Sequence, residues 1–250
     1  MLILALDTSG ETCAIALVDT PAPLGGDFQI ATLRAQITFR HQMDLLRRLA
    51  PSINWLLDDN GLSARDLDAF AVSLGPGSFT GLRIGVTTAK SMAYAVGKKL
   101  VGIPTLDILA GGVMVEHGDV IAPLIHARPG EVYAALYRAD DTSPGKLSDD
   151  LALPIGELLD KALGLKSKRV VFCGSGCRAN RSAIEDFLGD KAVFAPEWTD
   201  HPRGEILGRL ALDRLAAGES DDPFSLVPLY ARRPTPEIRM EAVREAKKAK

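Results

Sequence analysis

The chain has 250 residues, of which 46% are hydrophobic and 24% are charged, and this is ordinary globular composition. Its formal net charge of −3 provides no overall basic field, so any contact with RNA has to be local or made through a partner. Three cysteines are an odd number for a disulfide framework and indicate a reducing compartment. The sequence has no basic leader and no apolar stretch near roughly 18 residues. We therefore expect a cytoplasmic protein with no membrane span.

The first half of the sequence predicts three strands and then alternating helices and strands. Turn residues separate the short apolar runs that indicate the strands, and a Pro/Gly loop is expected over Pro21–Asp27. A helix is predicted over His41–Asp58, because apolar residues recur at helical spacing and form one apolar arc that includes Met43, Leu46 and Ala50. Pro51 should kink this helix or start a second one. A helix over Leu82–Val96 is expected to stop at Gly97. The other predicted features are strands at Leu2–Asp7, Cys13–Asp19, Phe28–Ile37, Ala69–Leu74 and Leu100–Ile103, a short turn capped by Ser63, and a helix that opens at Thr105.

The second half repeats this order less cleanly, with a variable loop over Ala139–Asp150. Its predicted elements are strands at Val120–His126, Glu131–Arg138, Val170–Cys173 and Ala192–Phe194, and helices at Ile155–Leu163, Asn180–Leu188 and Gly204–Ala217. Three strands followed by alternating helices and strands, written twice, predict an α/β fold with two mixed sheets flanked by helices. This is the order of the actin-like ATPase (ASKHA) superfamily, whose two lobes face each other across a nucleotide cleft. The expected domains are an N-terminal lobe over 1–110, a C-terminal lobe over 111–222, whose last helix is left free to return to the first lobe, and a tail over 223–250.

The segment Ser73–Gly85 reads SLGPGSFTGLRIG and predicts a strand end, a glycine loop and a helix start. Glycines let the backbone approach another group closely, and the free N–H groups of a helix N-terminus can hold phosphate. A tight turn packed on a neighbouring segment is an equally good interpretation. The Walker pattern is excluded, because no Gly-Lys-Ser/Thr follows. The motif loop consists of Gly75, Pro76, Gly77, Ser78, Phe79, Thr80 and Gly81.

As a string, this segment resembles the signature of the TsaB (YeaZ) family. The first 110 residues match that family tightly, and the second lobe matches only at islands. Further matches lie at Leu4–Ser9, Leu67–Val72, Gly102–Leu106, Ala127–Tyr133 and Pro228–Tyr230. The resemblance implies a partner subunit of the complex that forms N6-threonylcarbamoyladenosine in tRNA, acting with TsaD and TsaE after TsaC makes threonylcarbamoyl-AMP. It implies no tightly bound cofactor, with ATP or ADP expected at most at the partner interface, and contact with tRNA only through the complex.

The histidines argue that this chain is not the catalytic subunit. The resemblance also implies a catalytic paralogue, TsaD. In TsaD, the strand after the glycine-loop helix is expected to lead into two metal-binding histidines spaced four apart. Here that place reads Pro104-Thr105-Leu106-Asp107-Ile108. No two of the four histidines lie within one helical turn of each other, so that metal site cannot be built. No peptidase motif, such as His-Glu-x-x-His or Gly-x-Ser-x-Gly, is present either. We therefore predict no catalytic residue and no metal ligand.

The turn Asp7-Thr8-Ser9-Gly10 lies where the superfamily has its first phosphate loop. Asp7 could orient a magnesium ion through water, and Thr8 and Ser9 could bond phosphate oxygens. An Asx-type turn between two strands is the favoured interpretation, and a nucleotide site at these three residues is the weaker hypothesis.

Two helices of the first lobe are predicted to dock a partner. Leu82–Val96 has an apolar arc of roughly 200°, which is wider than one sheet needs. Its row of small residues permits close approach of a partner. Close approach of a helix of the same lobe is the alternative interpretation, to which we give half the weight. In the helix over His41–Asp58, Trp55 falls on the polar side, where it is an interface anchor unless Pro51 rotates the last turn and buries it. The predicted partner-binding residues are Trp55, Arg48, Arg83, Ile84, Thr87 and Thr88.

Two other interpretations stay open. A stand-alone small-molecule kinase or ATPase of the same fold is the alternative function, and a structural homodimer through the same helices comes third. The oligomeric state of the free chain is not determined by its sequence. The tail over Arg239–Lys250 has five basic and two acidic residues. A solvated helix end is favoured there over contact with tRNA phosphates.

Overall fold

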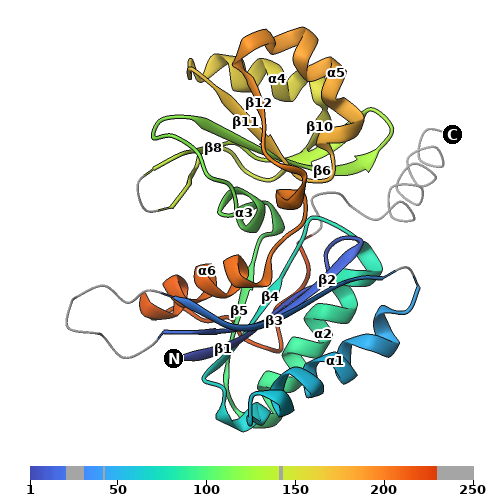
Figure 1. Cartoon of the computed structure of the whole chain (residues 1–250), viewed down its shortest axis with the longest axis vertical. Coiled ribbons are helices and arrows are strands. Elements are labelled where there is room, and N and C mark those ends of the chain that lie inside the picture. Colours follow the sequence, from blue (N-terminus) through green and yellow to red (C-terminus); the bar gives the residue numbers. More distant parts are fainter. Residues whose placement is uncertain (21–30, 42, 141–142, 230–250) are drawn as a thin grey trace, which may run out of the picture.

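The structure is a computed structural model that describes residues 1–20, 31–41, 43–140 and 143–229. It contains two β-sheets, each covered by helices and stacked along the long axis of the molecule (Figure 1). The predicted loop over Pro21–Asp27 and the basic tail over Arg239–Lys250 lie outside the described residues.

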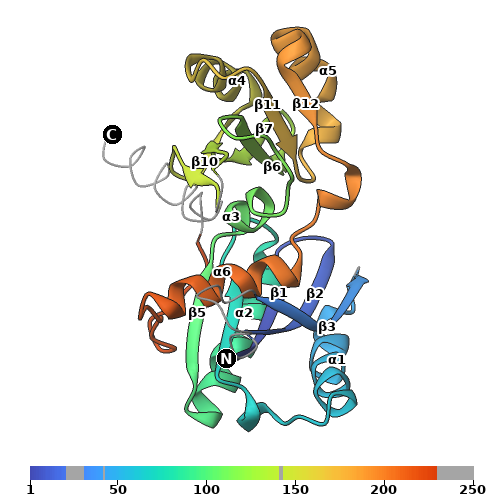
Figure 2. The same ribbon diagram turned by 60° about the vertical axis from the view of Figure 1, so that its left-hand side comes forward.

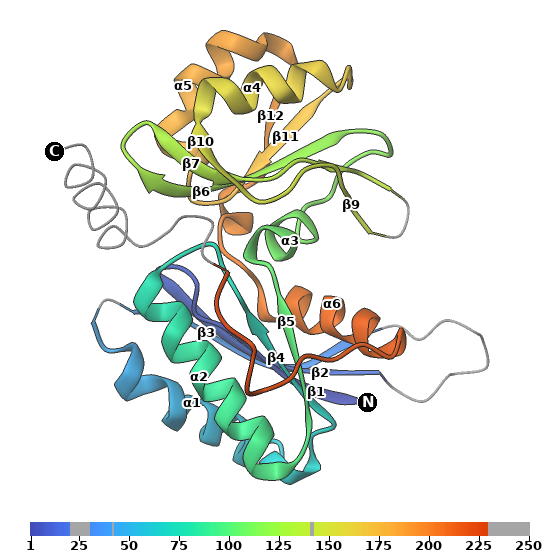
Figure 3. The ribbon, with the colours of Figure 1, turned by 180° about the vertical axis from the view of Figure 1, so that it is seen from behind.

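The first sheet has the strand order β3-β2-β1-β4-β5. β1 pairs antiparallel with β2 and parallel with β4, and β5 continues the parallel side. The central strands are buried along their whole length because helices cover both faces. α1 and α2 lie on one face and α6 on the other (Figure 3). The elements are β1 (Leu2–Asp7), β2 (Thr12–Asp19), β3 (Thr32–Arg40), α1 (Leu45–Asp59), β4 (Ala69–Ser73), α2 (Phe79–Val96), β5 (Lys99–Ile103) and α6 (Gly204–Ala216).

The second sheet has the order β10-β7-β6-β11-β12, with β8 and β9 paired beside β6. β6, β11 and β12 run parallel, whereas β7, β8 and β10 are antiparallel to their neighbours. Helices α4 and α5 cover its outer face (Figure 1). The elements are β6 (Val120–Arg128), β7 (Glu131–Ala134), β8 (Tyr137–Arg138), β9 (Gly145–Lys146), β10 (Leu151–Pro154), α4 (Ile155–Gly164), β11 (Val170–Cys173), α5 (Cys177–Leu188) and β12 (Ala192–Phe194).

A short helix, α3 (Thr105–Ala110), lies between the two sheets (Figure 2). After the second sheet the chain returns, and α6 packs on the first sheet against β1, β2 and β5. Among the described residues, single turns of 3-10 helix lie at Ala64–Asp66, Gly189–Lys191 and Glu197–Thr199. The predicted cap at Ser63 is confirmed, because Ser63 and Asp66 form a capping box.

The predicted α/β fold with two mixed sheets flanked by helices is confirmed. Some boundaries differ from prediction. Pro51 does not start a second helix, because α1 is continuous across it. Pro51 and Arg47 are exposed, so water can satisfy the carbonyl group that proline leaves without an amide partner. The predicted strand over Phe28–Ile37 begins only at Thr32 among the described residues and runs on to Arg40.

Other boundaries were predicted too short or too long. α2 begins at Phe79, three residues before the predicted start, because the Ser78 side chain accepts from Gly81 N. The predicted strand over Glu131–Arg138 is divided into β7 and β8, which pair with different segments. Every helix among the described residues is too short or too polar to span a bilayer.

Candidate functional site

The glycine loop connects β4 to α2 and lies directly on the turn after β1. A Cβ added at Gly77 would lie 2.2 Å from Ser9 O, and one at Gly81 would lie 2.1 Å from Thr8 O. Ser78 N donates to Ser9 O at 2.6 Å, which fixes the loop on this turn. The glycines therefore permit close packing of two backbone segments of the same lobe. This is the tight-turn interpretation of the motif, and the loop amide of Ser78 is used inside the protein.

The turn itself is closed by its own side chains. Asp7 Oδ1 accepts from Ser9 Oγ at 2.8 Å and from Ser9 N at 3.3 Å, which makes an Asx-type turn. Thr8 Oγ1 donates to Gly81 O at 2.8 Å. All three side chains are buried. The turn therefore does not fit a phosphate group or its metal ion, and the predicted nucleotide site at Asp7, Thr8 and Ser9 gains no support from the geometry.

Asp7 is nevertheless electrostatically unusual. Burial raises the pKa of its carboxyl to about 6, against the hydroxyl groups of Ser73 and Ser9, which act in the opposite direction. The carboxyl group is thus held in a site that disfavours its charge.

The small residues of α2 face their own sheet. Gly85, Ala89 and Ala93 are buried, and a Cβ at Gly85 would lie 2.1 Å from Thr8 Oγ1. The expectation that a partner packs on this row is therefore wrong. The row lets α2 lie close to β1 and β4, which is packing within the lobe.

The outer flanks of the two helices contact other parts of the chain. The Arg48 guanidinium of α1 lies 3.9 Å from the centre of the Phe39 ring on β3. On α2, Lys90 Nζ donates to Leu226 O at 2.8 Å, and the Tyr94 ring meets the Phe224 ring edge-on at 5.2 Å. On each helix, these contacts identify the flank that faces away from the other helix.

The opposite flanks are turned toward each other, because α1 and α2 lie side by side on one face of the sheet (Figure 3). Helical spacing places Leu46 and Ala50 on this flank of α1, and Met43 lies just before the helix begins at Leu45. Met43 is 98% exposed and Leu46 is 74% exposed, which is unusual for apolar residues so close to a core helix. On α2 the facing residues at helical spacing are Ile84, Thr88, Ser91 and Ala95. We call these seven residues the inter-helix face.

The structure divides the predicted partner-binding residues between surfaces. Ile84 and Thr88 lie in the inter-helix face, where Thr88 Oγ1 donates to Ile84 O at 2.8 Å. Trp55 is 58% exposed, so the alternative that Pro51 buries it is wrong. It lies two helical turns from Arg48, on the outer flank of α1.

Arg83 and Thr87 lie on the exposed surface of α2, where the Arg83 guanidinium is 4.1 Å from the centre of the Phe79 ring. Met43 and Leu46 were missed as surface residues. Their apolar periodicity was visible, but it assigned them to the buried arc of the helix.

Among the residues that the structure describes, no three histidine, cysteine, aspartate or glutamate side chains are placed to hold a metal ion. Cys13, Cys173 and Cys177 are free thiols, and burial raises the pKa of each well above its ordinary value. In the segment that follows β5, Thr105 N donates to Gly75 O and Asp107 accepts from the Tyr137 hydroxyl. Both residues thus have structural contacts within the chain.

Comparison with known proteins agrees with this geometry. A family model described as TsaD, tRNA N6-adenosine threonylcarbamoyltransferase, matches residues 41–239. The Bacillus subtilis (strain 168) protein named tRNA threonylcarbamoyladenosine biosynthesis protein TsaB is 33% identical over 233 residues, which cover 93% of this chain and 94% of that protein. The chain belongs to the TsaB family.

Other members of the TsaB family support the assignment. The Escherichia coli (strain K12) protein of the same name is 30% identical over 180 residues, covering 72% of this chain and 73% of that protein. The crystal structure of YeaZ from Pseudomonas aeruginosa is similar with a TM-score of 0.71 and 26% identity, and it covers 92% of this chain and 99% of that one. A second Pseudomonas aeruginosa structure, described as an uncharacterized protein with similarity to peptidase YEAZ, has a TM-score of 0.74 at the same identity and coverage. The TsaB family thus accounts for both lobes of the chain.

Proposed function

We propose that this chain is the non-catalytic partner subunit of the complex that forms N6-threonylcarbamoyladenosine in tRNA. In this role it binds the catalytic subunit TsaD, works with TsaE in the same complex, and reaches tRNA through that complex in the cytoplasm. The names of the Bacillus subtilis and Escherichia coli relatives support the pathway. ATP or ADP, if required, is expected at the junction with the partner, because the Asp7–Ser9 turn is filled by its own side chains.

The observation that supports docking is the inter-helix face. Its residues Met43 and Leu46 are largely exposed, and water around apolar surface is unfavourable. A pair of partner helices that inserts there would cover Met43 and Leu46 and complete the layer. Such a contact belongs to the standard class of interfaces, which bury roughly 1,200–2,000 Å² in total.

The first test changes the face itself. Leu46→Glu places a charge where the partner would exclude water, and it should weaken TsaD binding about thirtyfold or more. Ile84→Glu on α2 should act in the same direction. Leu163→Glu is the matched control, because Leu163 of α4 is also an exposed helical leucine, at 44%. Calorimetry with purified TsaD measures the affinities, and circular dichroism checks folding. Equal TsaD affinity of Leu46→Glu and Leu163→Glu refutes docking at the inter-helix face.

The two exposed tryptophans show how far the docking surface extends. Trp55→Ala should weaken TsaD binding if the partner also covers the outer flank of α1, whereas Trp198→Ala in the second lobe should leave it unchanged. Trp198 is 76% exposed and is therefore a fair control.

The non-catalytic role is tested by reconstitution. The chain alone should transfer no threonylcarbamoyl group to tRNA and should hold no stoichiometric metal, and addition of TsaD and TsaE should be required for transfer. Transfer by the lone chain contradicts the proposal. Two copies could also pair through the same face when TsaD is missing, and sedimentation of the free chain measures that competition. Transfer of the γ-phosphoryl group of ATP to a sugar or to acetate by the lone chain, with release of ADP, is the outcome that supports the kinase alternative.

A further inference from the structure

Helix α3 has only six residues, yet its side chains belong to the cores of both lobes. Ile108 packs in the cluster that α6 forms with the first sheet. Leu106, Leu109 and Ala110 pack in a different cluster, with Tyr137 of β8. All of them are almost fully buried. Because protein interiors are packed without free volume, α3 cannot shift in one core without disturbing the other.

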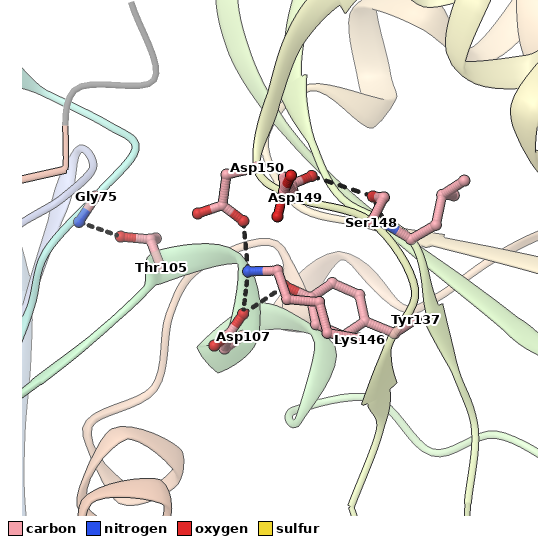
Figure 4. A network of polar contacts seen from close by, with 9 residues as sticks. Gly75, Thr105, Asp107, Tyr137, Lys146, Ser148, Asp149 and Asp150 are labelled. Carbon is pink, nitrogen blue, oxygen red and sulfur yellow. Dashed lines mark hydrogen bonds and ion pairs between the residues drawn. The ribbon is translucent and has the colours of Figure 1, made fainter.

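The beginning of α3 is tied to the glycine loop. Thr105 N donates to Gly75 O at 2.8 Å, and Gly75 N donates to Thr105 Oγ1 at 3.1 Å (Figure 4). Gly75 has φ +107°, and a Cβ there would lie 2.8 Å from Leu82 Cδ1 in the first turn of α2. The position of Thr105 therefore bears directly on where α2 begins.

Another side of α3 is tied to the second lobe by an ionic cluster. Asp107 accepts from the Tyr137 hydroxyl at 2.6 Å and from Lys146 Nζ at 2.9 Å, and Lys146 also donates to Asp150 at 2.6 Å. Figure 4 shows the Lys146 ammonium group between the two carboxylates. The side chain of Asp150 is only 16% exposed and that of Lys146 is 33% exposed, so solvent screens this cluster less than it screens a surface pair.

We propose that α3 couples the β8–β9 ribbon of the second lobe to the glycine loop. The ion pairs of Lys146 with Asp107 and Asp150 determine how strongly the ribbon and α3 are coupled. A contact that moves the ribbon would then alter the first turn of α2, one of the helices that we propose to dock TsaD. The consequence for docking rests on the proposed function. The coupling itself is a property of the free chain.

The test is amide hydrogen exchange on the free, full-length chain. Lys146→Met keeps the length of the side chain and removes its charge. It should speed exchange of the amides in residues 74–82 about tenfold, although this segment has no contact with Lys146. Lys146→Arg keeps a cation and should retain most of the protection. Lys161→Met is the matched control, because Lys161 is an exposed lysine on α4 of the same lobe. Faster exchange confined to residues 137–151 in Lys146→Met overturns the coupling.

Thr105→Val tests the link from its other end. It removes the hydroxyl acceptor of Gly75 N at nearly constant volume, so exchange should accelerate in the glycine loop and also at residues 145–150. If the two residues act through one path, Lys146→Met should add little in the Thr105→Val background. If the increases in exchange rate caused by the two substitutions simply multiply in the double variant, the coupling is overturned. If Lys146→Met does not fold, the exchange of residues 145–150 in Thr105→Val alone decides whether the coupling exists. Since exchange is measured without TsaD, normal coupling in a chain that does not bind TsaD contradicts only the proposed function.

Discussion

At the scale of single residues, Asp7 shows how the motif loop uses polar groups. Its carboxyl group is fully buried and accepts from the Ser9 hydroxyl at 2.8 Å, which holds the turn that supports Gly77 and Gly81. Burial raises its pKa from 3.8 to about 6. The sequence pattern favoured the Asx-type turn, but it could not show that the turn is covered by α2. Burial depends on that long-range contact.

The stability of the chain should depend on pH through Asp7. Between about pH 4 and 6 the folded state keeps a proton that the unfolded chain releases, so the free energy of unfolding falls as pH rises through this window. The fall amounts to about 3 kcal/mol in total and is complete above the folded-state pKa. Asp7→Asn is neutral at every pH and keeps an oxygen that can accept from Ser9.

Urea unfolding measures this dependence. The stability of Asp7→Asn relative to the original chain should rise by about 2–3 kcal/mol from pH 4 to pH 7. A difference that does not change with pH shows that Asp7 ionises normally in the folded chain.

At the scale of elements, α2 is built to lie close to the sheet. Its glycines would normally weaken a helix, because glycine is the least favourable ordinary residue in helix interiors. Here they leave room for the turn that follows β1, because a Cβ added at Gly85 would strike the side chain of Thr8. α4 offers a contrast, because a Cβ at Gly156 would meet nothing within 4 Å.

Glycine-to-alanine substitution should therefore have opposite effects in the two helices. Gly156→Ala should stabilise the chain by about 0.5–1 kcal/mol through helix propensity. Gly85→Ala should destabilise it by about 1–3 kcal/mol, because the buried Thr8 side chain must move. Thermal and urea unfolding give both values, and stabilisation by Gly85→Ala contradicts the close contact.

The sequence predicted some elements to the residue and others poorly, for identifiable reasons. Val170–Cys173 and Ala192–Phe194 are short apolar runs bounded by polar or turn residues, and both were predicted with the observed bounds. The start of α2 was missed because the Ser78 cap depends on a side-chain hydrogen bond. Periodicity predicted which residues form the apolar side of α1, but not what covers them, so the exposure of Leu46 became visible only once the neighbours were placed. The packing of α3 in two different cores likewise depends on tertiary contacts, which the sequence pattern does not show.

At the scale of the whole molecule, the segment over 217–229 holds the first lobe together. We call it the strap. It leaves α6 on one face of the first sheet, passes β5, and reaches α2 on the other face (Figure 3). Asp221 makes the central contacts of the strap, because it accepts from Gly102 N at 2.7 Å and from Arg214 Nη1 at 2.9 Å. At its end, Leu229 N donates to Leu74 O at 2.8 Å beside the glycine loop.

Removal of the Asp221 carboxylate should loosen both faces together. Asp221→Ala leaves a β5 amide and the Arg214 guanidinium without their acceptor, so we expect a loss of about 2 kcal/mol. Glu219→Ala is the control on the same arginine, since its side chain is 55% exposed and its pair with Arg214 is worth at most about 1 kcal/mol. Equal unfolding free energies for the two variants refute the special role of Asp221.

The strap also decides how copies of this chain can meet. β5 is the last strand on its side of the first sheet, and the end strand of a sheet offers unpaired backbone groups to strands of other molecules. Here Asp221 N donates to Leu100 O, the Asp221 carboxylate accepts from Gly102 N, and Arg214 donates to Gly102 O. These backbone groups are already used, so a strand from another molecule cannot add to this edge and begin an aggregate. The chain therefore offers its partners a surface of helices, and protects itself from indiscriminate sheet extension at β5.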